Sequence, residues 1–224
     1  MGNYALPKQF LDLGGRPVII HTIEKFLTCT SLDALYVGVH RDWISYLQDM
    51  LKKHIPDMAG RITVVCGGED RNTTLFNVIA QIEADHGVSE DSIIVTHDAV
   101  RPFVTLRMIE ENIEAAKKYG AVDTVIPAVD TIVCSEDASF ISSVPDRRQM
   151  YQGQTPQSFR IGLLKKLYAS LTEEEKAVMT DACKICVVRD QKVKLVQGSD
   201  TNIKITTPGD LKIAQAMVAG EILD

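Results

Sequence analysis

Short apolar segments alternate with amphipathic segments along the first half of this sequence. Residues 35–39, 62–66 and 93–96 are mainly apolar runs, which are typical of strands that are buried on both faces. Each run is followed by a segment with the apolar spacing of a helix. Because parallel strands need a long crossover, usually a helix, this order indicates consecutive strand–helix–strand units. The expected fold class is α/β, with a Rossmann-like, mainly parallel sheet sandwiched by helices.

The expected helices follow from their start signals and apolar stripes. Pro17 opens the first, and Thr207 followed by Pro208 opens the last. Thr172 begins a capping box with Glu175, which indicates a further helix. Three more helices are expected at residues 43–54, 73–85 and 105–118, and one more strand is expected at residues 192–196.

The alternation stops after Gly120. Residues 122–133 alternate apolar and polar positions, a polar turn follows, and residues 140–144 are again rich in apolar side chains. This pattern predicts a β-hairpin outside the main sheet. Because an exposed two-stranded ribbon is only marginally stable alone, we expect it to pack on a second copy of the chain. We therefore expect a protruding dimerisation arm at about residues 124–152.

The acidic composition limits the classes of partner. The formal net charge of −6 and the isoelectric point near 5.4 argue against nucleic acid or an anionic membrane as a partner. No apolar run approaches the roughly 20 residues of a membrane helix, and no signal-peptide pattern opens the sequence, so the cytoplasm is the expected location. The cysteines and histidines show no complete spacing for zinc. A redox pair at Cys183 and Cys186 would require a lowered thiol pKa.

A polar cluster follows the apolar run at residues 93–96. His97, Asp98, Arg101 and Pro102 come where the expected strand ends, and ligands of α/β proteins bind at the carboxyl ends of parallel strands. A carboxylate suits a hard cation such as Mg²⁺, and a guanidinium suits phosphate. The cluster therefore favours a site for a metal-bound phosphate. An ion pair that holds a turn is the structural alternative.

Further polar residues lie in contexts that suit a ligand. Lys8 lies in a proline-stiffened segment, and Arg147 precedes a polar, proline-bounded strand. Residues 67–74 join a strand to a helix through two glycines, an arrangement that offers backbone N–H groups at a helix start. Strand alternation is expected to place Asn202 on one face with Lys204. Taken alone, each of these features is equally consistent with a solvent-exposed turn that binds no ligand.

Taken in order, these features resemble the cytidylyltransferases that join CTP to a sugar-alcohol phosphate. The matching motifs are Pro-Lys-Gln-Phe at 7–10, Gly-Gly-x-x-Arg-x-x-Thr at 67–74, His-Asp-Ala-x-Arg-Pro at 97–102, Asp-Thr at 130–131, an arginine at 147, Gln-Thr-Pro-Gln at 154–157, Thr-Asp-Ala at 180–182 and Asn-Ile-Lys at 202–204. Residues 151–157 and 180–185 look more like the ribitol 5-phosphate branch of the family. The alternative is the related branch of isoprenoid synthesis, which uses 2-C-methyl-D-erythritol 4-phosphate. The resemblance implies a single nucleotidyltransferase domain over residues 1–224.

The resemblance also implies a reaction and a set of site residues. CMP would pass from CTP to D-ribitol 5-phosphate, giving pyrophosphate and CDP-ribitol, a precursor of teichoic acid, with Mg²⁺ held by Asp98. The implied nucleotide-binding residues are Gly67, Gly68, Glu69, Asp70, Arg71, Asn72, Thr73, Thr74, Asp98 and Ala99. The implied catalytic residues are Lys8, Arg147 and Lys204. The implied acceptor-binding residues are Arg101, Thr131, Arg147, Thr155 and Lys204. In relatives the arm crosses to a partner subunit, which implies a homodimer in which Thr131 serves the neighbouring site.

The family pattern includes one further segment, a first strand and the loop Leu-Ala-Gly-Gly-x-Gly-x-Arg, which align before Met1. We expect a chain that starts at Met1 to lack that strand of the sheet. We also expect it to lack the backbone N–H groups that cradle the triphosphate. A protein of a different class, a non-catalytic binding protein without this loop, is the corresponding alternative.

Overall fold

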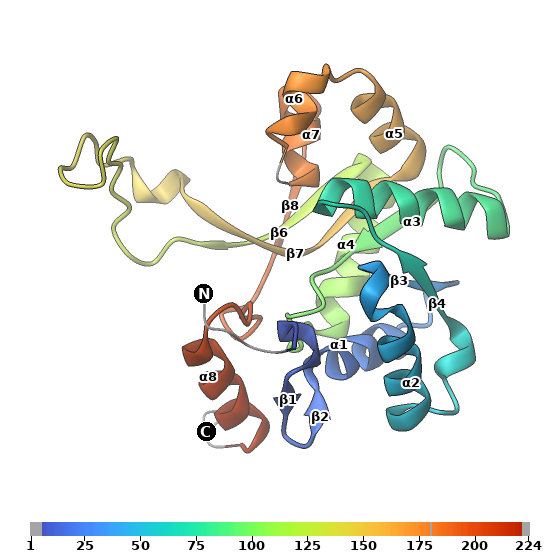
Figure 1. Ribbon diagram of the computed structural model, residues 1–224. Coiled ribbons are helices and arrows are strands. Elements are labelled where there is room, and N and C mark those ends of the chain that lie inside the picture. Colours follow the sequence, from blue (N-terminus) through green and yellow to red (C-terminus); the bar gives the residue numbers. More distant parts are fainter. Residues whose placement is uncertain (1–5, 180, 221–224) are drawn as a thin grey trace.

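The computed structural model describes residues 6–179 and 181–220 (Figure 1). Its strands are β1 (Asp12–Leu13), β2 (Arg16–Pro17), β3 (Leu35–Val39), β4 (Ile62–Cys66), β5 (Ile93–Thr96), β6 (Ala121–Pro127), β7 (Tyr151–Arg160) and β8 (Lys194–Gln197). Its α-helices are α1 (Val18–Leu27), α2 (Ile44–His54), α3 (Arg71–His86), α4 (Leu106–Tyr119), α5 (Ile161–Ala169), α6 (Glu173–Ala177), α7 (Ala182–Val188) and α8 (Pro208–Val218). Short 3-10 helices are η1 (Lys8–Phe10), η2 (Arg41–Trp43), η3 (Ala59–Arg61) and η4 (Arg147–Gln149). The expected α/β fold class is confirmed.

The main sheet has the strand order β5-β7-β6-β8. β6 and β8 run parallel, whereas β7 is antiparallel to both of its neighbours, β5 and β6. β3 and β4 form a separate parallel pair. β7 follows β6 as the second strand of a long hairpin, and strands joined in this way run in opposite directions. The other strands of the main sheet therefore share one direction, and their carboxyl ends meet at one edge.

The helices begin and end at the signals that the sequence carries. Thr105 caps α4 by accepting a hydrogen bond of 3.3 Å from a backbone N–H three residues on, and Gly120 ends that helix with a φ of 82°. Thr172 opens α6 with the expected capping box. Thr207 and Asp210 form another at the start of α8. None of the described helices is long and apolar enough to cross a membrane.

The chain between β6 and β7, residues 128–150, forms an arm that extends away from the body of the molecule (Figure 1). The strand expected at residues 140–144 is wrong, because this segment contributes only a single bridge, between Ser143 and Cys134. A ribbon gains its stability from packing on a face, and the arm has no such support within one chain. Phe140, for example, is 77% exposed. The role of the arm in dimerisation stays a prediction.

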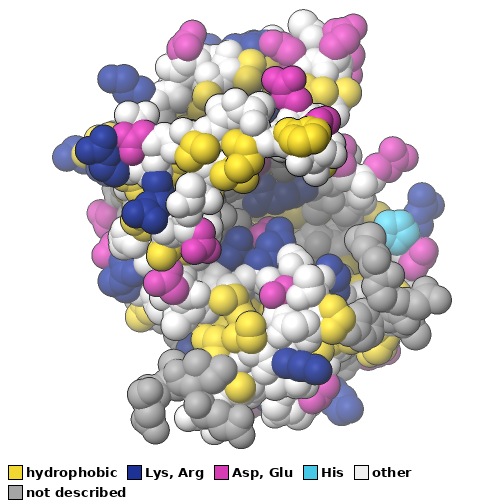
Figure 2. Space-filling view, turned by 90° about the vertical axis from the view of Figure 1, so that its left-hand side faces the viewer, with side chains coloured by type: hydrophobic (Ala, Val, Ile, Leu, Met, Phe, Trp, Pro, Cys, Tyr) yellow, Lys and Arg dark blue, Asp and Glu magenta, His cyan; other side chains and the backbone are white. Residues whose placement is uncertain are grey.

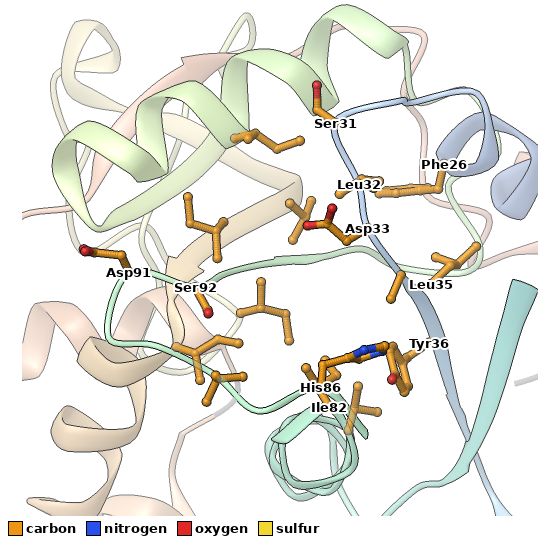
Figure 3. A pocket seen from close by; sticks show the side chains of 18 of the residues that line it. Phe26, Ser31, Leu32, Asp33, Leu35, Tyr36, Ile82, His86, Asp91 and Ser92 are labelled. Atoms are coloured by element: carbon orange, nitrogen blue, oxygen red, sulfur yellow. The ribbon is translucent and has the colours of Figure 1, made fainter. Parts of the chain in front are cut away.

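The edges of β3 and β5 that border a common cavity have no partner strand among residues 6–179 and 181–220. The cavity has a volume of about 420 Å³ and is lined by both strands and by side chains from the helices around them (Figure 3). Leu35 and Tyr36 line the same cavity as Ile93 and Ile94, so the amino ends of the two strands lie at the same end of it. Among the described residues, no strand lies in the position between β3 and β5.

Candidate active site

Three basic side chains from separate parts of the chain surround Asp98, which lies two residues after β5. The ammonium nitrogen of Lys204 is 3.0 Å from one carboxylate oxygen, and Nε of Arg101 is 3.4 Å from the same oxygen. The guanidinium of Arg71, at the start of α3, lies 3.8 Å from the other oxygen. The Asp98 side chain is only 16% exposed. On the face that carries the arm, Lys and Arg side chains gather within a central hollow (Figure 2).

The balance of charge in this cluster is positive. Burial disfavours the charged form of Asp98, but the attraction of Lys204 and Arg71 outweighs burial and holds the pKa of the carboxyl below its ordinary value. Asp98 is therefore ionised at neutral pH. The ion pairs of this cluster join three cations to two carboxylates, Asp98 and Asp181, the second of which lies 3.4 Å from Arg71, so one positive charge is left to attract a polyanion.

A chain of hydrogen bonds fixes the turn that carries Asp98. The backbone N–H of Asp98 donates to the hydroxyl of Thr155 at 3.1 Å, and that hydroxyl lies 2.9 Å from Nδ1 of His97. Nε2 of His97 lies 3.0 Å from the carbonyl oxygen of Arg101, which can only accept, so the ring proton is on Nε2. Burial lowers the pKa of His97 to about 4. The ring is thus neutral, and its bare Nδ1 accepts from Thr155.

The segment after β8 anchors two of the expected site residues through its backbone. Arg101 is 8% exposed and donates to the carbonyl oxygen of Asn202 at 2.7 Å. Lys8, in η1, donates to the carbonyl oxygen of Thr206. Both contacts place cationic side chains from distant parts of the sequence against residues 202–206, the segment that carries Lys204.

Asn202 itself departs from the expectation, because it is fully buried rather than exposed with Lys204. Its amide nitrogen donates to Oε1 of Gln154 at 3.1 Å and to the carbonyl oxygen of Thr155 at 2.9 Å. These bonds hold residues 202–206 against β7 in an irregular conformation, so the two-residue alternation of a strand does not apply. Asn202 is therefore a structural residue of the site.

Residues 67–74 form a tight, internally bonded turn into α3. The backbone N–H of Gly68 donates to the hydroxyl of Thr74 at 2.9 Å, and Asp70 caps the helix by accepting from the N–H of Thr73 at 2.7 Å. A Cβ atom on Gly68 would lie 2.2 Å from a side-chain carbon of Thr73, so this position requires glycine. The expected nucleotide loop is therefore preformed.

Several residues expected at the nucleotide use their polar groups inside the protein instead. Asn72 is 4% exposed, and its amide donates to the carbonyl oxygen of Met179 at 2.7 Å. The carbonyl oxygen of Ala99 accepts from the hydroxyl of Thr22 at 2.9 Å. Glu69, by contrast, is exposed. The side chain of Asn72 therefore supports the loop from inside the protein.

Thr131 and Arg147 lie on the arm and are exposed. The guanidinium of Arg147 donates to the carbonyl oxygen of Val129 at 2.6 Å. In the part of the chain that the structure describes, no hydrogen bond or ion pair joins either residue to Asp98 or Lys204. A single chain thus joins Arg71, Arg101, Lys204 and Thr155 to Asp98 but does not bring Thr131 and Arg147 to them.

The sequence reasoning missed a pair of carboxylates behind the site. Asp123 on β6 and Asp181 before α7 both accept hydrogen bonds from the side-chain amide of Gln157, at 3.0 and 2.9 Å. Asp181 belongs to the Thr-Asp-Ala motif, which was the available signal; Thr180 of that motif lies outside the described residues. Nothing in the sequence around Asp123 distinguishes it from a surface residue.

Burial raises the pKa of Asp123 to about 6, which predicts a pH-dependent stability. The folded protein binds this proton more tightly than the unfolded chain does, so stability falls as the pH rises from about 4 through 6. We expect a loss of about 1–2 kcal/mol from this residue, after allowance for its partial exposure. Urea unfolding at pH 4.5 and 7.5 measures it: Asp123→Asn should lose less stability over this range than the unmodified protein. An identical loss in both proteins would contradict the assignment.

The cysteine pair does not support the redox interpretation. Cys183 and Cys186 lie on α7 and are both buried. Burial raises the pKa of the Cys186 thiol to about 11 and raises that of Cys183 further. A redox-active pair needs a thiolate, which these surroundings disfavour. The two residues are therefore part of the apolar core between α7 and the sheet.

Comparisons with known proteins identify similar sequences and structures. The sequence profile of the family described as IspD, 2-C-methyl-D-erythritol 4-phosphate cytidylyltransferase, matches residues 2–220. The 4-diphosphocytidyl-2C-methyl-D-erythritol synthase structure from Anaerococcus prevotii is 29% identical, with a TM-score of 0.79 over 96% of this chain and 91% of that one. The 2-C-methyl-D-erythritol 4-phosphate cytidylyltransferase of Thermus thermophilus is 28% identical, with a TM-score of 0.73 over 95% and 94%. The corresponding Francisella tularensis enzyme is 26% identical, with a TM-score of 0.77 over 93% and 92%.

Proposed function

This chain belongs to the IspD family of cytidylyltransferases, and we propose that it transfers CMP from CTP to a polyol phosphate. In this reaction a phosphate oxygen of the acceptor attacks the α-phosphorus of CTP. The bond from that phosphorus to the bridging oxygen breaks, and pyrophosphate leaves. Such a reaction needs positioned reactants and stabilisation of the growing negative charge. The observation that supports the proposal is the cluster of Arg71, Arg101 and Lys204 around Asp98.

The contacts and exposure of each basic side chain suit it to a different task in the reaction. Arg101 is buried and bonded to a carbonyl oxygen, so it orients Asp98 and the segment after β8. The side chain of Lys204 is 46% exposed, so it can turn from Asp98 to a phosphate. Lys8 is held by a carbonyl oxygen, which leaves its positive charge unneutralised. We assign Lys8 to the charge that grows on the α-phosphate and Lys204 to the attacking phosphate.

Mg²⁺ is the proposed cofactor, and Asp98 is the residue that would hold it. Among the described residues, no group of three or more His, Cys, Asp or Glu side chains could hold a metal ion. A single carboxylate nevertheless fits Mg²⁺, which is commonly bound through one or two carboxylates together with substrate phosphates. When bound, the ion would neutralise charge on the triphosphate. The three cations around Asp98 favour its arrival together with the nucleotide.

The acceptor is proposed from the comparisons. The family profile and the solved relatives carry the name of 2-C-methyl-D-erythritol 4-phosphate or of its cytidylylated product. This favours 2-C-methyl-D-erythritol 4-phosphate, the alternative of the sequence analysis, as the acceptor. D-Ribitol 5-phosphate, the acceptor first expected, is the second candidate. It is favoured by the sequences at residues 151–157 and 180–185.

The test of the function is pyrophosphate release with CTP and each of the two acceptors in separate reactions. We expect release that depends on CTP, on Mg²⁺ and on 2-C-methyl-D-erythritol 4-phosphate, with ATP and UTP as nucleotide controls. Release with ribitol 5-phosphate alone would show that ribitol 5-phosphate is the acceptor. The proposed cytidylyl transfer would then stand. No release with either acceptor would favour the non-catalytic binding protein.

We further propose that the protein is a homodimer in which the arm packs on a second copy. Phe140 is 77% and Ile141 64% exposed, and burial of such side chains would supply the apolar area that one chain lacks. Such packing would also carry Thr131 and Arg147 to the neighbouring site. The arm is thus the element that would complete each site.

The double substitution Phe140→Ser with Ile141→Ser is expected to raise the dimer dissociation constant at least about tenfold. The reason is the loss of apolar burial at the arm, with no change in the core. Sedimentation velocity over a range of protein concentrations measures it. Val187→Ser is the matched control, because Val187 is 63% exposed and lies on α7, away from the arm. An unmodified protein that sediments as a monomer at all concentrations would contradict the proposal.

A further inference from the structure

The side-chain amide of Gln157 connects the first residue of α3 with the residue before α7. Gln157 lies on β7 and is 2% exposed. Its Oε1 accepts from both terminal nitrogens of Arg71, each at 3.3 Å. Its Nε2 donates to Asp123 at 3.0 Å and to Asp181 at 2.9 Å. One buried amide thus joins a guanidinium to two carboxylates.

The two carboxylates fix which way this amide faces. Asp123 and Asp181 accept from Nε2, so the carbonyl oxygen of Gln157 must point at Arg71. The reversed amide would present its NH₂ group to a guanidinium and its oxygen to two carboxylates. Donors would then meet donors and acceptors would meet acceptors, which leaves buried groups unsatisfied. The orientation is therefore set by the network.

The side chain of Arg71 extends from this network to the carboxylate of Asp98. Its Nη1 lies 3.4 Å from Asp181, and its Nη2 lies 3.8 Å from Asp98. Its side chain is 36% exposed, so part of the guanidinium faces solvent. An arginine without such partners would sample many rotamers and lose them on binding a ligand. Contacts to Gln157 and Asp181 restrict this freedom before the ligand arrives.

We infer that Asp181 and Gln157 are positioning residues that hold the Arg71 guanidinium beside Asp98, where it meets the triphosphate of CTP. This inference rests on the proposed function, because it takes Arg71 as a contact of the nucleotide. It gives a role to the aspartate of the Thr-Asp-Ala motif, which otherwise only caps α7 through a 2.8 Å bond from the N–H of Cys183. Asp181 acts through Arg71 and does not touch the reacting atoms.

The test is Asp181→Asn, assayed by pyrophosphate release. Asparagine caps a helix as well as aspartate does, so α7 is retained. The substitution removes the negative charge that faces Arg71. We expect KM for CTP to rise roughly tenfold, the effect of losing one charge-assisted contact. We expect kcat and KM for the acceptor to change by less than about threefold, because neither depends on this contact.

Asp123→Asn is the matched control. Asp123 accepts from the same amide as Asp181, but it makes no hydrogen bond or ion pair with Arg71 among the described residues. Its replacement is expected to leave KM for CTP unchanged. If both substitutions raised KM for CTP equally, the effect would not come from the contact between Asp181 and Arg71, and the positioning role of Asp181 would be overturned.

A double-mutant cycle with Arg71→Ala separates this inference from the proposed function. Arg71→Ala should raise KM for CTP by itself, and Asp181→Asn should add nothing in that background. If Arg71→Ala left KM for CTP unchanged, the proposed nucleotide contact would be wrong. If Arg71→Ala raised KM and Asp181→Asn did not, the nucleotide contact would stand and the positioning role would be overturned. Additive effects would likewise overturn it, because Asp181 would then act independently of Arg71.

Discussion

Replacing Lys8 with alanine is expected to lower kcat by about 10²- to 10³-fold, the usual effect of losing one preorganised group that stabilises charge in the transition state. Lys8 lies in η1 and is held by the carbonyl oxygen of Thr206, two residues from Lys204. A carbonyl oxygen orients the ammonium group without neutralising it. The charge therefore remains available to the α-phosphate during transfer.

Pyrophosphate release at saturating CTP and acceptor measures the effect of Lys8→Ala on the chemical step. Lys212→Ala is the matched control, because Lys212 is an exposed lysine of α8 and its loss changes the net charge equally. We expect the control to keep its turnover, and both variants to keep the thermal midpoint of the unmodified protein. A Lys8→Ala protein that turned over at the normal rate would remove Lys8 from the catalytic group.

Replacing Asp98 with asparagine is expected to lower kcat/KM for CTP by at least about 10²-fold. Asparagine keeps the shape of the side chain but removes the negative charge that Lys204, Arg101 and Arg71 share. The proposed Mg²⁺ would lose its protein ligand, and the three cations would lose their shared counter-charge. Both effects act on the triphosphate.

The rate as a function of Mg²⁺ concentration distinguishes a metal role of Asp98 from a purely structural one. Asp98→Asn should require more Mg²⁺ for half of its maximal rate, whereas Asp98→Glu should keep part of the activity and of the Mg²⁺ dependence. Asp200→Asn, the same change at an exposed aspartate, is the control. An Asp98→Asn protein with an unchanged Mg²⁺ dependence would assign the metal elsewhere.

Local patterns predicted much of this fold because they depend on neighbouring residues. The strands β3, β4 and β5 and the helices α2, α3 and α4 were each predicted within two residues of their observed ends. α7 was missed, since its seven residues are mostly buried and show no polar face to give it a helical period. The strand expected at residues 140–144 failed for a different reason: its apolar side chains are present, but they are exposed, and no surface among the described residues supports them.

The sequence predicts the site residues that directly follow a strand. It does not predict contacts between residues that are far apart in the chain. Asp98 and Arg101 follow β5 directly, so their place at the sheet edge follows from the topology. The contacts of Arg71 with Gln157 and Asp181 join residues 86 and 110 positions apart, and no local pattern reports such pairs. The burial of Asn202 also depends on a remote partner, the strand β7, which carries Gln154 and Thr155.

Among the described residues, no strand lies between β3 and β5, and different groups of buried side chains pack on the two sides of this gap. One group of buried side chains belongs to η1, α1, α2, β3 and β4, and another to α3, β5, β6, β7, α5 and α7. Across the division the two groups are joined by side-chain packing, as between Phe26 and Met108, rather than by a ladder of main-chain bonds. Parting along this line would break no hydrogen bond between strands of the two groups. Each strand edge that has no partner among the described residues presents main-chain N–H and C=O groups, so we expect another strand to pair there most readily.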